Sequence, residues 1–231
     1  MTPRSSTVAA NSASYAHIYQ RKLPHRGANG DIEKFAPKFL EDRLRSFAKD
    51  MRICLTGTPS DDSTGPTHAY FPALMSCCGM LEYLSGLFAG HTRSCSIKEI
   101  IAYAKFLPKP DYCDDTIRIL FSAFRNAIAH HGIASGVWID PHPAALGRRI
   151  TWRIHADARR PALRIIEEAH VLRYDPPWDC RYTHRVHISL DRLWRDIRDS
   201  VLTENGYRDK LVSSPELQKK FAKCMHELYP A

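Results

Sequence analysis

The chain has 231 residues, of which 44% are hydrophobic and 25% are charged, a composition typical of a globular protein with a sizeable core. It contains no run of about 18 apolar residues and no apolar stretch directly after its start, which argues against a membrane-spanning helix and a secretory signal. The formal net charge of +8 favours anionic partners such as nucleic acid.

Cysteine usage argues against a disulfide framework. The seven cysteines form no CxxC pair, and their odd number shows no regular spacing. Such a pattern indicates reduced thiols in a cytoplasmic protein.

Residues 1–30 contain no acidic side chain and are rich in Ser, Ala and Asn. We interpret them as a disordered basic arm. A transit peptide has a similar composition, but this stretch lacks an amphipathic stripe.

Four helices are predicted between residues 31 and 132. Asp31 is expected to cap the first, and Pro37 within its first turns can shift its start. A loop is expected over 57–67. In the second helix, Gly79 and Gly86 lie seven residues apart and should allow a neighbouring helix to approach closely. The predicted helices cover residues 32–55, 70–89, 96–106 and 112–131.

The pattern changes after Gly132. Alternating or β-branched segments separated by Pro- and Gly-bearing turns predict three or four antiparallel strands, although 162–173 is also compatible with a helix. Helices return at 190–202 and 214–229. The fold class is therefore mainly α: a helical bundle of 31–132 and 189–231 with a small antiparallel β-sheet insertion over 133–188, α+β overall. The expected strands cover residues 134–140, 149–156, 162–175 and 181–189.

The stretch 121-FSAFRNAIAHHG-132 combines an apolar helix with four polar side chains near its end. At about 100° per residue, Asn126 and His130 share the side opposite the apolar residues, and Arg125 lies at the flank. His131 falls among the apolar positions and is expected to be structural. The residues on the apolar side are Ile117, Leu120, Phe121, Phe124 and Ile128.

Two interpretations of these polar residues remain open. Basic side chains near the last carbonyls, followed by Gly132, are typical of a helix C-terminus. An Arg fork that binds phosphate oxygens beside a His that transfers protons also constitutes a metal-independent site for phosphoryl chemistry. Glu82 lies in the apolar 70–89 helix; it is either exposed or paired, with Arg125 as a candidate partner.

The string Phe-Arg-Asn-Ala-Ile-Ala-His resembles the signature of HEPN domains, an all-helical superfamily. The motif has an Arg, a polar residue and then a His after four to six intervening residues. Arg125, Asn126 and His130 match it with four intervening residues; His131 gives the alternative register with five. The resemblance covers about 68–131, and the 133–188 segment departs from a minimal bundle of this family.

The resemblance implies a homodimer with a composite cleft and a metal-independent endoribonuclease without a cofactor. His130 would act as the general acid/base, Arg125 would stabilise charge on phosphorus, and Asn126 would orient the phosphate or the imidazole. It also implies an RNA substrate and a toxin–antitoxin or phage-defence setting, with an antitoxin protein as partner. The alternatives are a non-catalytic binding or dimerisation module and an unrelated helical protein.

Three other patterns in the second half have structural explanations. His184 and His187 point to opposite faces of a strand, which argues against a zinc pair. Residues 148–198 carry twelve arginines and no lysine, which suits phosphate recognition but also a solvated surface. Four aromatic residues among these arginines could stack bases, but packing of the sheet onto the bundle is the favoured interpretation. These aromatic residues are Trp138, Trp152, Trp178 and Tyr182.

Overall fold

A computed structural model describes residues 29–56, 69–131, 134, 136–145, 147–155, 158–172 and 180–229. The expected basic arm, apart from its last two residues, lies outside these ranges. The 57–67 loop, Gly132 and Trp178 lie outside them as well.

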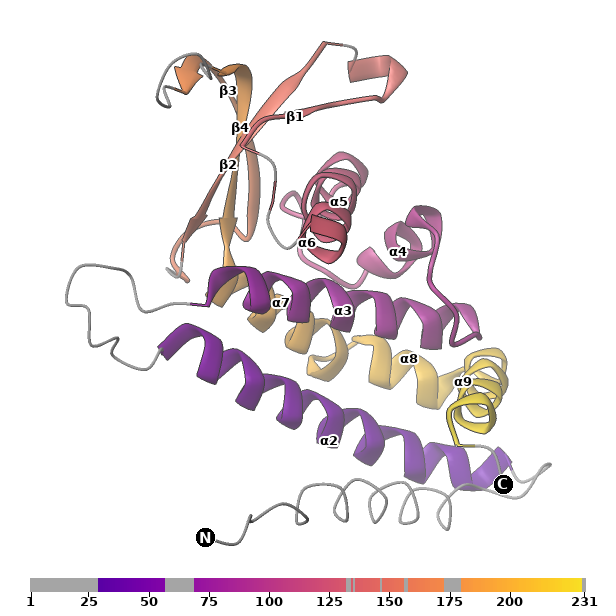
Figure 1. Ribbon diagram of the computed structural model, residues 1–231. Helices are drawn as coiled ribbons and strands as arrows, with labels where there is room; N and C mark the ends of the chain where they lie inside the picture. Colours follow the sequence, from indigo (N-terminus) through magenta and orange to yellow (C-terminus); the bar gives the residue numbers. More distant parts are fainter. Residues whose placement is uncertain are drawn as a thin grey trace, which may run out of the picture.

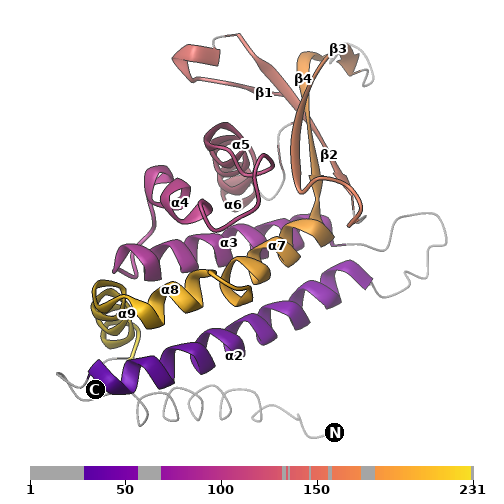
Figure 2. The same ribbon diagram turned by 180° about the vertical axis from the view of Figure 1, so that it is seen from behind.

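The described chain is a helical bundle that carries a four-stranded sheet at one end (Figure 1). Helix α3 is central, because it packs against α2, α4, α7 and α9. The view from behind shows the same order of layers, with α2 on one side of α3 and α4–α6 on the other (Figure 2). The helices are α2 (Asn29–Thr56), α3 (Tyr70–Ala89), α4 (Ile97–Ala104), α5 (Asp114–Ile119), the π-helical turn η1 (Leu120–Arg125), α6 (Asn126–His131), α7 (Leu190–Leu202), α8 (Tyr207–Ser213) and α9 (Pro215–Leu228).

Helix α2 begins earlier than the sequence predicts. Asn29 and Gly30 are already helical, so Asp31 is not the N-cap residue, and that prediction is wrong. Pro37 lies inside the helix, which continues past it for five further turns. A buried stripe that includes Ile32, Phe39 and Leu40 faces the bundle, and this packing stabilises the helix despite the proline.

Helix α3 lies in the middle of the core. Among the described residues it is the one helix that is long and apolar enough to cross a membrane by length and composition. A core helix passes the same test, and half of the apolar window in α3 is buried in the bundle. The helix ends at Gly90, whose φ of +91° is a left-handed conformation that glycine adopts without strain.

The two glycines of α3 do not behave as predicted. Gly79 is exposed, and a Cβ built on it would meet nothing within 4 Å. Gly86 is buried, but its close neighbour is the carbonyl oxygen of His91, 2.8 Å from a built Cβ. The close approach is therefore made by the chain that returns after α3, and not by a neighbouring helix.

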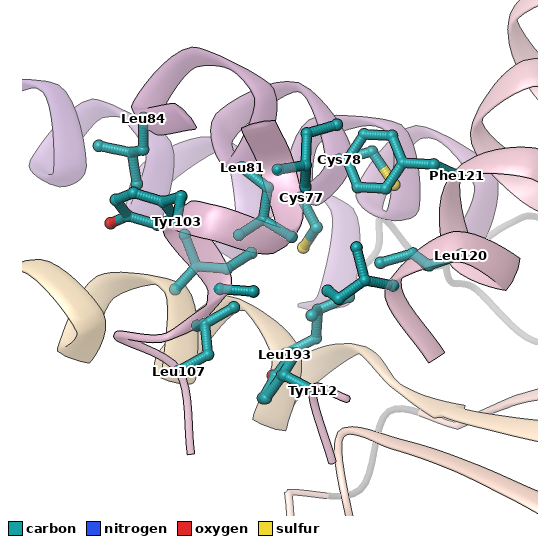
Figure 3. Packing of buried hydrophobic residues seen from close by; sticks show 14 of the residues in the cluster. Cys77, Cys78, Leu81, Leu84, Tyr103, Leu107, Tyr112, Leu120, Phe121 and Leu193 are labelled. Atoms are coloured by element: carbon teal, nitrogen blue, oxygen red, sulfur yellow. The ribbon is translucent and has the colours of Figure 1, made fainter. Parts of the chain in front are cut away.

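The hydrophobic core joins α3 to α4, the α5–α6 segment and α7 (Figure 3). Cys77, Leu81 and Phe121 are buried there, and Tyr112 donates a hydrogen bond to Asp196 at 3.0 Å. All seven cysteines are free thiols, as predicted. Burial raises the pKa of Cys78 to about 12, so this thiol packs as a small protonated hydrophobe.

The sheet has the order β1-β2-β4-β3 and is mixed. β1 pairs antiparallel with β2, and β3 pairs antiparallel with β4. The central strands β2 and β4 are parallel, so the prediction of an antiparallel sheet is wrong for this pair. After β2 the chain forms β3 at the far edge of the sheet. The next strand, β4, then lies between β2 and β3. The strands are β1 (Trp138–Ile139), β2 (Arg149–His155), β3 (Leu163–Leu172) and β4 (Cys180–Ser189). Residues 163–172 therefore form a strand and not the alternative helix.

The sheet packs one apolar face onto the helices. Trp152 makes edge-on contacts with Phe71 and Phe124, at centroid distances of 5.6 and 6.4 Å. Tyr182 is buried, and Trp138 is half-buried against the core. Trp138 and Trp152 therefore pack the sheet onto the bundle, which agrees with the favoured interpretation. Tyr182 is buried within the sheet, against Arg185 and His170, so none of the three forms an open stacking platform.

A charged cluster also fixes the sheet to α5. Asp140, which follows β1, is fully buried and accepts hydrogen bonds from Arg118 of α5 and from Arg148, at distances down to 2.6 Å. Asp115 binds the same two arginines. Burial alone would raise the pKa of Asp140, but the hydrogen bonds from both arginines and from the His142 backbone N–H outweigh it and lower the pKa well below its usual value.

Candidate functional site

The helix that carries the polar string is interrupted by a π turn directly before it. Over η1 the hydrogen bonds change register, and the N–H of Asn126 donates to the carbonyl of Phe121, five residues earlier. A π turn adds one residue to a helical turn and is frequent at functional sites. Here it ends at Arg125, so Asn126 begins a new α-helical segment with a different rotation.

This turn changes which face each side chain occupies. One extra residue rotates everything that follows by about 100° relative to an uninterrupted α-helix. The expected apolar residues are buried, from Ile117 to Ile128, and Asn126 and His130 are exposed as expected. His131, however, is exposed rather than buried. The prediction of a structural, core-facing His131 is therefore wrong; this residue is the last of α6, and the buried side of the helix ends before it.

Arg125 is held by Glu82 of α3. Its Nη2 donates to Glu82 Oε2 at 2.9 Å, and its Nη1 donates to Asn126 Oδ1 at 3.2 Å. The side chains of Arg125 and Glu82 are 29% and 17% exposed, so the pair is partly shielded from water and aims the guanidinium at the surface. A guanidinium has five N–H donors. Two are used by these contacts with described residues, and three remain for a ligand.

A pocket of about 160 Å³ lies beside this ion pair, and Glu82, Ser122, Arg125 and Asn126 form its polar wall. The opposite wall is the 94–97 segment together with Ile100. Glu82 Oε1 accepts a hydrogen bond from the backbone N–H of Cys95 at 3.3 Å. Glu82 therefore fixes both walls, one through Arg125 and the other through Cys95.

His130 lies one helical turn beyond this pocket. Within the described part of the chain it makes no hydrogen bond, and its nearest aromatic neighbour is the His131 ring, with 6.5 Å between centroids. The structure thus joins Arg125, Asn126 and Glu82 by hydrogen bonds and leaves His130 exposed on the same helix end. In a single protomer, no hydrogen bond between described residues connects His130 to the other three.

A second cluster borders the pocket and was not found in the sequence. His91, Cys95 and Glu99 each place one potential ligand atom within 4.8 Å of the others; their spacing of four residues is the signal that could have shown it. Ser96 and Glu99 form a capping box for α4, and His91 Nε2 lies 2.8 Å from Glu99 Oε1. Hydrogen bonds from His91 and Ser96 lower the pKa of Glu99 to about 2.

This cluster has a structural explanation. Burial raises the pKa of Cys95 to about 11, so the thiol is protonated at neutral pH. A divalent cation would have to displace that proton and compete with the capping box for Glu99. We therefore assign His91, Cys95 and Glu99 the task of shaping the 91–99 segment that forms one wall of the pocket.

His184 and His187 of β4 project from opposite faces of the sheet, as predicted. The sequence did not predict the partner of His187. Its Nδ1 lies 3.0 Å from Nε2 of His155 on β2, and the two rings are parallel within 7°.

Comparison of the chain with protein-family models, with curated proteins and with solved structures gave no match. The functional argument therefore depends on the chemistry of the pocket and of its surroundings.

Proposed function

We propose that the protein is a metal-independent endoribonuclease of the HEPN type that acts as a homodimer. The observation that carries the proposal is the Glu82–Arg125 pair at the pocket wall, with Asn126 on the same guanidinium. This pair places the guanidinium of Arg125 at the surface, with N–H donors that no described residue uses. His130, whose imidazole can donate or accept a proton, lies one turn away.

In the proposed reaction the ribose 2′-hydroxyl attacks the adjacent phosphorus. His130 accepts the proton of the 2′-hydroxyl and passes it to the 5′-oxygen as the P–O5′ bond breaks, which yields a 2′,3′-cyclic phosphate and a 5′-hydroxyl end. Arg125 stabilises the negative charge that develops on the phosphoryl oxygens. Asn126, held by its contact with Arg125, orients the phosphate. No cofactor is needed for these steps.

A homodimer is proposed because one protomer leaves the set incomplete. Arg125 and Asn126 are joined by a hydrogen bond, whereas His130 is exposed and shares no described hydrogen bond with them. Pairing of two helix ends brings the Arg125 of one protomer near the His130 of the other. We further propose that the protein works in the cytoplasm as a toxin or phage-defence component, with an antitoxin protein as a partner.

The test is cleavage of end-labelled RNA in EDTA by the parent protein and by Arg125→Ala, His130→Ala and His131→Ala variants. Loss of cleavage by about 100-fold or more is expected for the first two, by analogy with the loss of one catalytic group. His131→Ala removes a neighbouring histidine that is also exposed, and it tests the alternative register of the motif. Cleavage that survives both of the other substitutions overturns the proposal.

The composite site has its own test. Arg125→Ala and His130→Ala subunits are mixed, exchanged and assayed together. If each site takes its arginine from one protomer and its histidine from the other, mixed dimers contain one intact site, and part of the activity returns. Sites confined to single protomers give no recovery.

A non-catalytic binding module is the second candidate. It is favoured by the ion pair itself, because Glu82 offsets part of the Arg125 charge. Absence of cleavage by every form, with dimers intact by light scattering, would support this candidate.

A further inference from the structure

The sheet has a basic face opposite its core face. Side chains alternate along strands, and the register pairs Arg153 of β2 with His187 of β4, and Arg164 of β3 with the same His187. These three residues therefore form a row across three strands, which we call the basic row. The alternate positions Val186 and Ile188 are buried on the other side.

The charges of this face are largely uncompensated. Arg153 and Arg164, together with Arg160 from the β2–β3 connection, are exposed and have no ion pair or hydrogen bond in the described part of the chain. The neighbouring Arg185, by contrast, pairs with Glu168 at 3.3 Å. Three arginine forks thus lie in one region, and no carboxylate of the described residues forms an ion pair with any of them.

A pocket of about 250 Å³ lies at this point. Arg160, Arg164 and His187 supply its polar atoms, and Pro161 and Ile166 form an apolar floor. Guanidinium groups around a small apolar surface suit a nucleotide, because the forks bind phosphate oxygens and the floor accepts a sugar or a base.

His187 contributes a polar atom that the protein leaves unused. Its Nδ1 is occupied by His155, whereas its Nε2 is buried and has no partner among described atoms. Burial, followed by the charges of Arg185, Arg160 and Arg153, lowers the pKa of His187; Glu168 opposes this effect. An anion in the pocket would supply the missing negative charge and an acceptor for Nε2.

We propose that this pocket binds a backbone phosphate of single-stranded RNA, at a distance from the Arg125–His130 site. The choice of RNA rests on the proposed function, whereas the phosphate chemistry rests on the pocket. The sheet then serves to hold the substrate strand while the end of α6 cuts it.

The experiment measures RNA affinity by fluorescence anisotropy with a labelled single-stranded oligonucleotide, at several salt concentrations and in EDTA. It uses a His130→Ala background so that the strand stays intact. The pocket variant is Arg160→Ala/Arg164→Ala. Its matched control is Lys49→Ala/Arg52→Ala, which removes the same charge from two exposed side chains of α2 that form no ion pair or hydrogen bond with described residues.

The pocket variant is expected to bind about tenfold more weakly, and its plot of log affinity against log salt should flatten by about 1.4, the value for two phosphate contacts on a single strand. The control should change affinity less than about twofold. Equal losses in the two variants would overturn the inference, since they indicate a general charge effect.

A second readout uses inorganic phosphate as the probe. The ring-proton NMR signals of His187 are followed with pH, with and without phosphate, and assigned by a His187→Gln variant. A His187 pKa that rises with phosphate and rises likewise with the oligonucleotide supports the inference, because both place an anion beside the ring. A His187 pKa that phosphate or the oligonucleotide leaves unchanged overturns it. The two proposals can fail separately. If Arg160→Ala/Arg164→Ala weakens RNA binding but the protein with His130 intact cleaves no RNA, the nuclease proposal fails and this inference stands.

Discussion

Glu82 and Arg125 form an ion pair between α3 and the end of the π turn, although they lie 43 residues apart in the chain. The 2.9 Å contact between Glu82 Oε2 and Arg125 Nη2 sets the direction of the guanidinium, and the other oxygen of Glu82 holds the backbone of Cys95. A single carboxylate therefore positions the proposed charge-stabilising group and the wall that faces it.

Removal of this carboxylate should impair activity without touching the substrate. Glu82→Gln keeps an oxygen acceptor but loses the charge, so we expect kcat to fall by about tenfold; Glu82→Ala loses both, and about 100-fold is expected from misplacement of Arg125. KM should change little, because uniform binding is not removed. Glu216→Gln, at an exposed carboxylate of α9 that pairs with Lys220, is the control. Unchanged kcat in Glu82→Ala would refute the positioning role.

The π turn makes a second prediction possible. Deletion of Ser122 should convert η1 to regular α-helix. The residues that follow would then rotate about the helix axis by about 100°. Arg125 and His130 would then leave the pocket side, and RNA cleavage should be lost. Circular dichroism and the melting temperature should show a folded protein. Cleavage at the parent rate by the deletion variant would show that the turn does not position the site.

The outline of the fold could be predicted from the sequence because apolar periodicity reports burial on individual elements. The helices at 70–89 and 190–202 and the strands after residue 148 follow it closely. The same alternation occurs in parallel and antiparallel pairs, so the parallel β2–β4 pairing was missed. The order of the strands depends on contacts between distant segments, here on the position of β4 between β2 and β3. The local sequence pattern of a single strand does not contain this information.

The site was predicted in part for a similar reason. The residue types and spacing of Arg125, Asn126 and His130 are visible in the sequence, and Asn126 and His130 are exposed as expected. The exposure of His131 was missed, because this residue ends α6 and a helical wheel does not show where the packing against the core stops. For Glu82, the need of a half-buried carboxylate for a partner suggested Arg125, but only the structure selects between pairing and exposure.

Asp140 is predicted to stabilise the attachment of the sheet to the bundle. Its side chain is fully buried between two arginines. Asp140→Asn should lower the free energy of unfolding at pH 7 by about 3 kcal/mol, since it leaves Arg118 and Arg148 undercompensated. Urea unfolding gives this value, and Asp114→Asn, at an exposed residue of the same helix α5, should cost less than about 0.5 kcal/mol.

The Asp140→Asn variant should also show how the ion pairs of Asp140 make stability depend on pH. The folded state lowers the pKa of Asp140 below its usual value, so the carboxylate stabilises the protein above a pH of about 4, and this contribution is lost as the pH falls further. The difference in unfolding free energy between parent and Asp140→Asn should therefore shrink as the pH falls from about 5 to about 2, an interval that begins about one unit above the usual aspartate pKa of about 3.9. A difference that stays constant over this interval would contradict the assigned ion pairs.

The two glycines of α3 provide the last prediction, because they share a helix but differ in their surroundings. A Cβ at Gly86 would lie 2.8 Å from the carbonyl oxygen of His91 and 3.6 Å from the Cys95 sulfur. Gly86→Ala must therefore push the 91–95 segment away from α3, and a loss of about 1–3 kcal/mol in unfolding free energy is expected.

Gly79→Ala meets nothing within 4 Å on the exposed side of the same helix. It should stabilise the protein by about 0.5–1 kcal/mol, since alanine loses less backbone entropy than glycine in a helix. Both variants are unfolded in urea at one protein concentration, because the proposed dimer would make stability concentration-dependent. Gly86→Ala should also reduce RNA cleavage, since the displaced segment forms one wall of the pocket beside Arg125. Equal stability of the two variants would show that the close approach at Gly86 is not needed to hold that wall against α3.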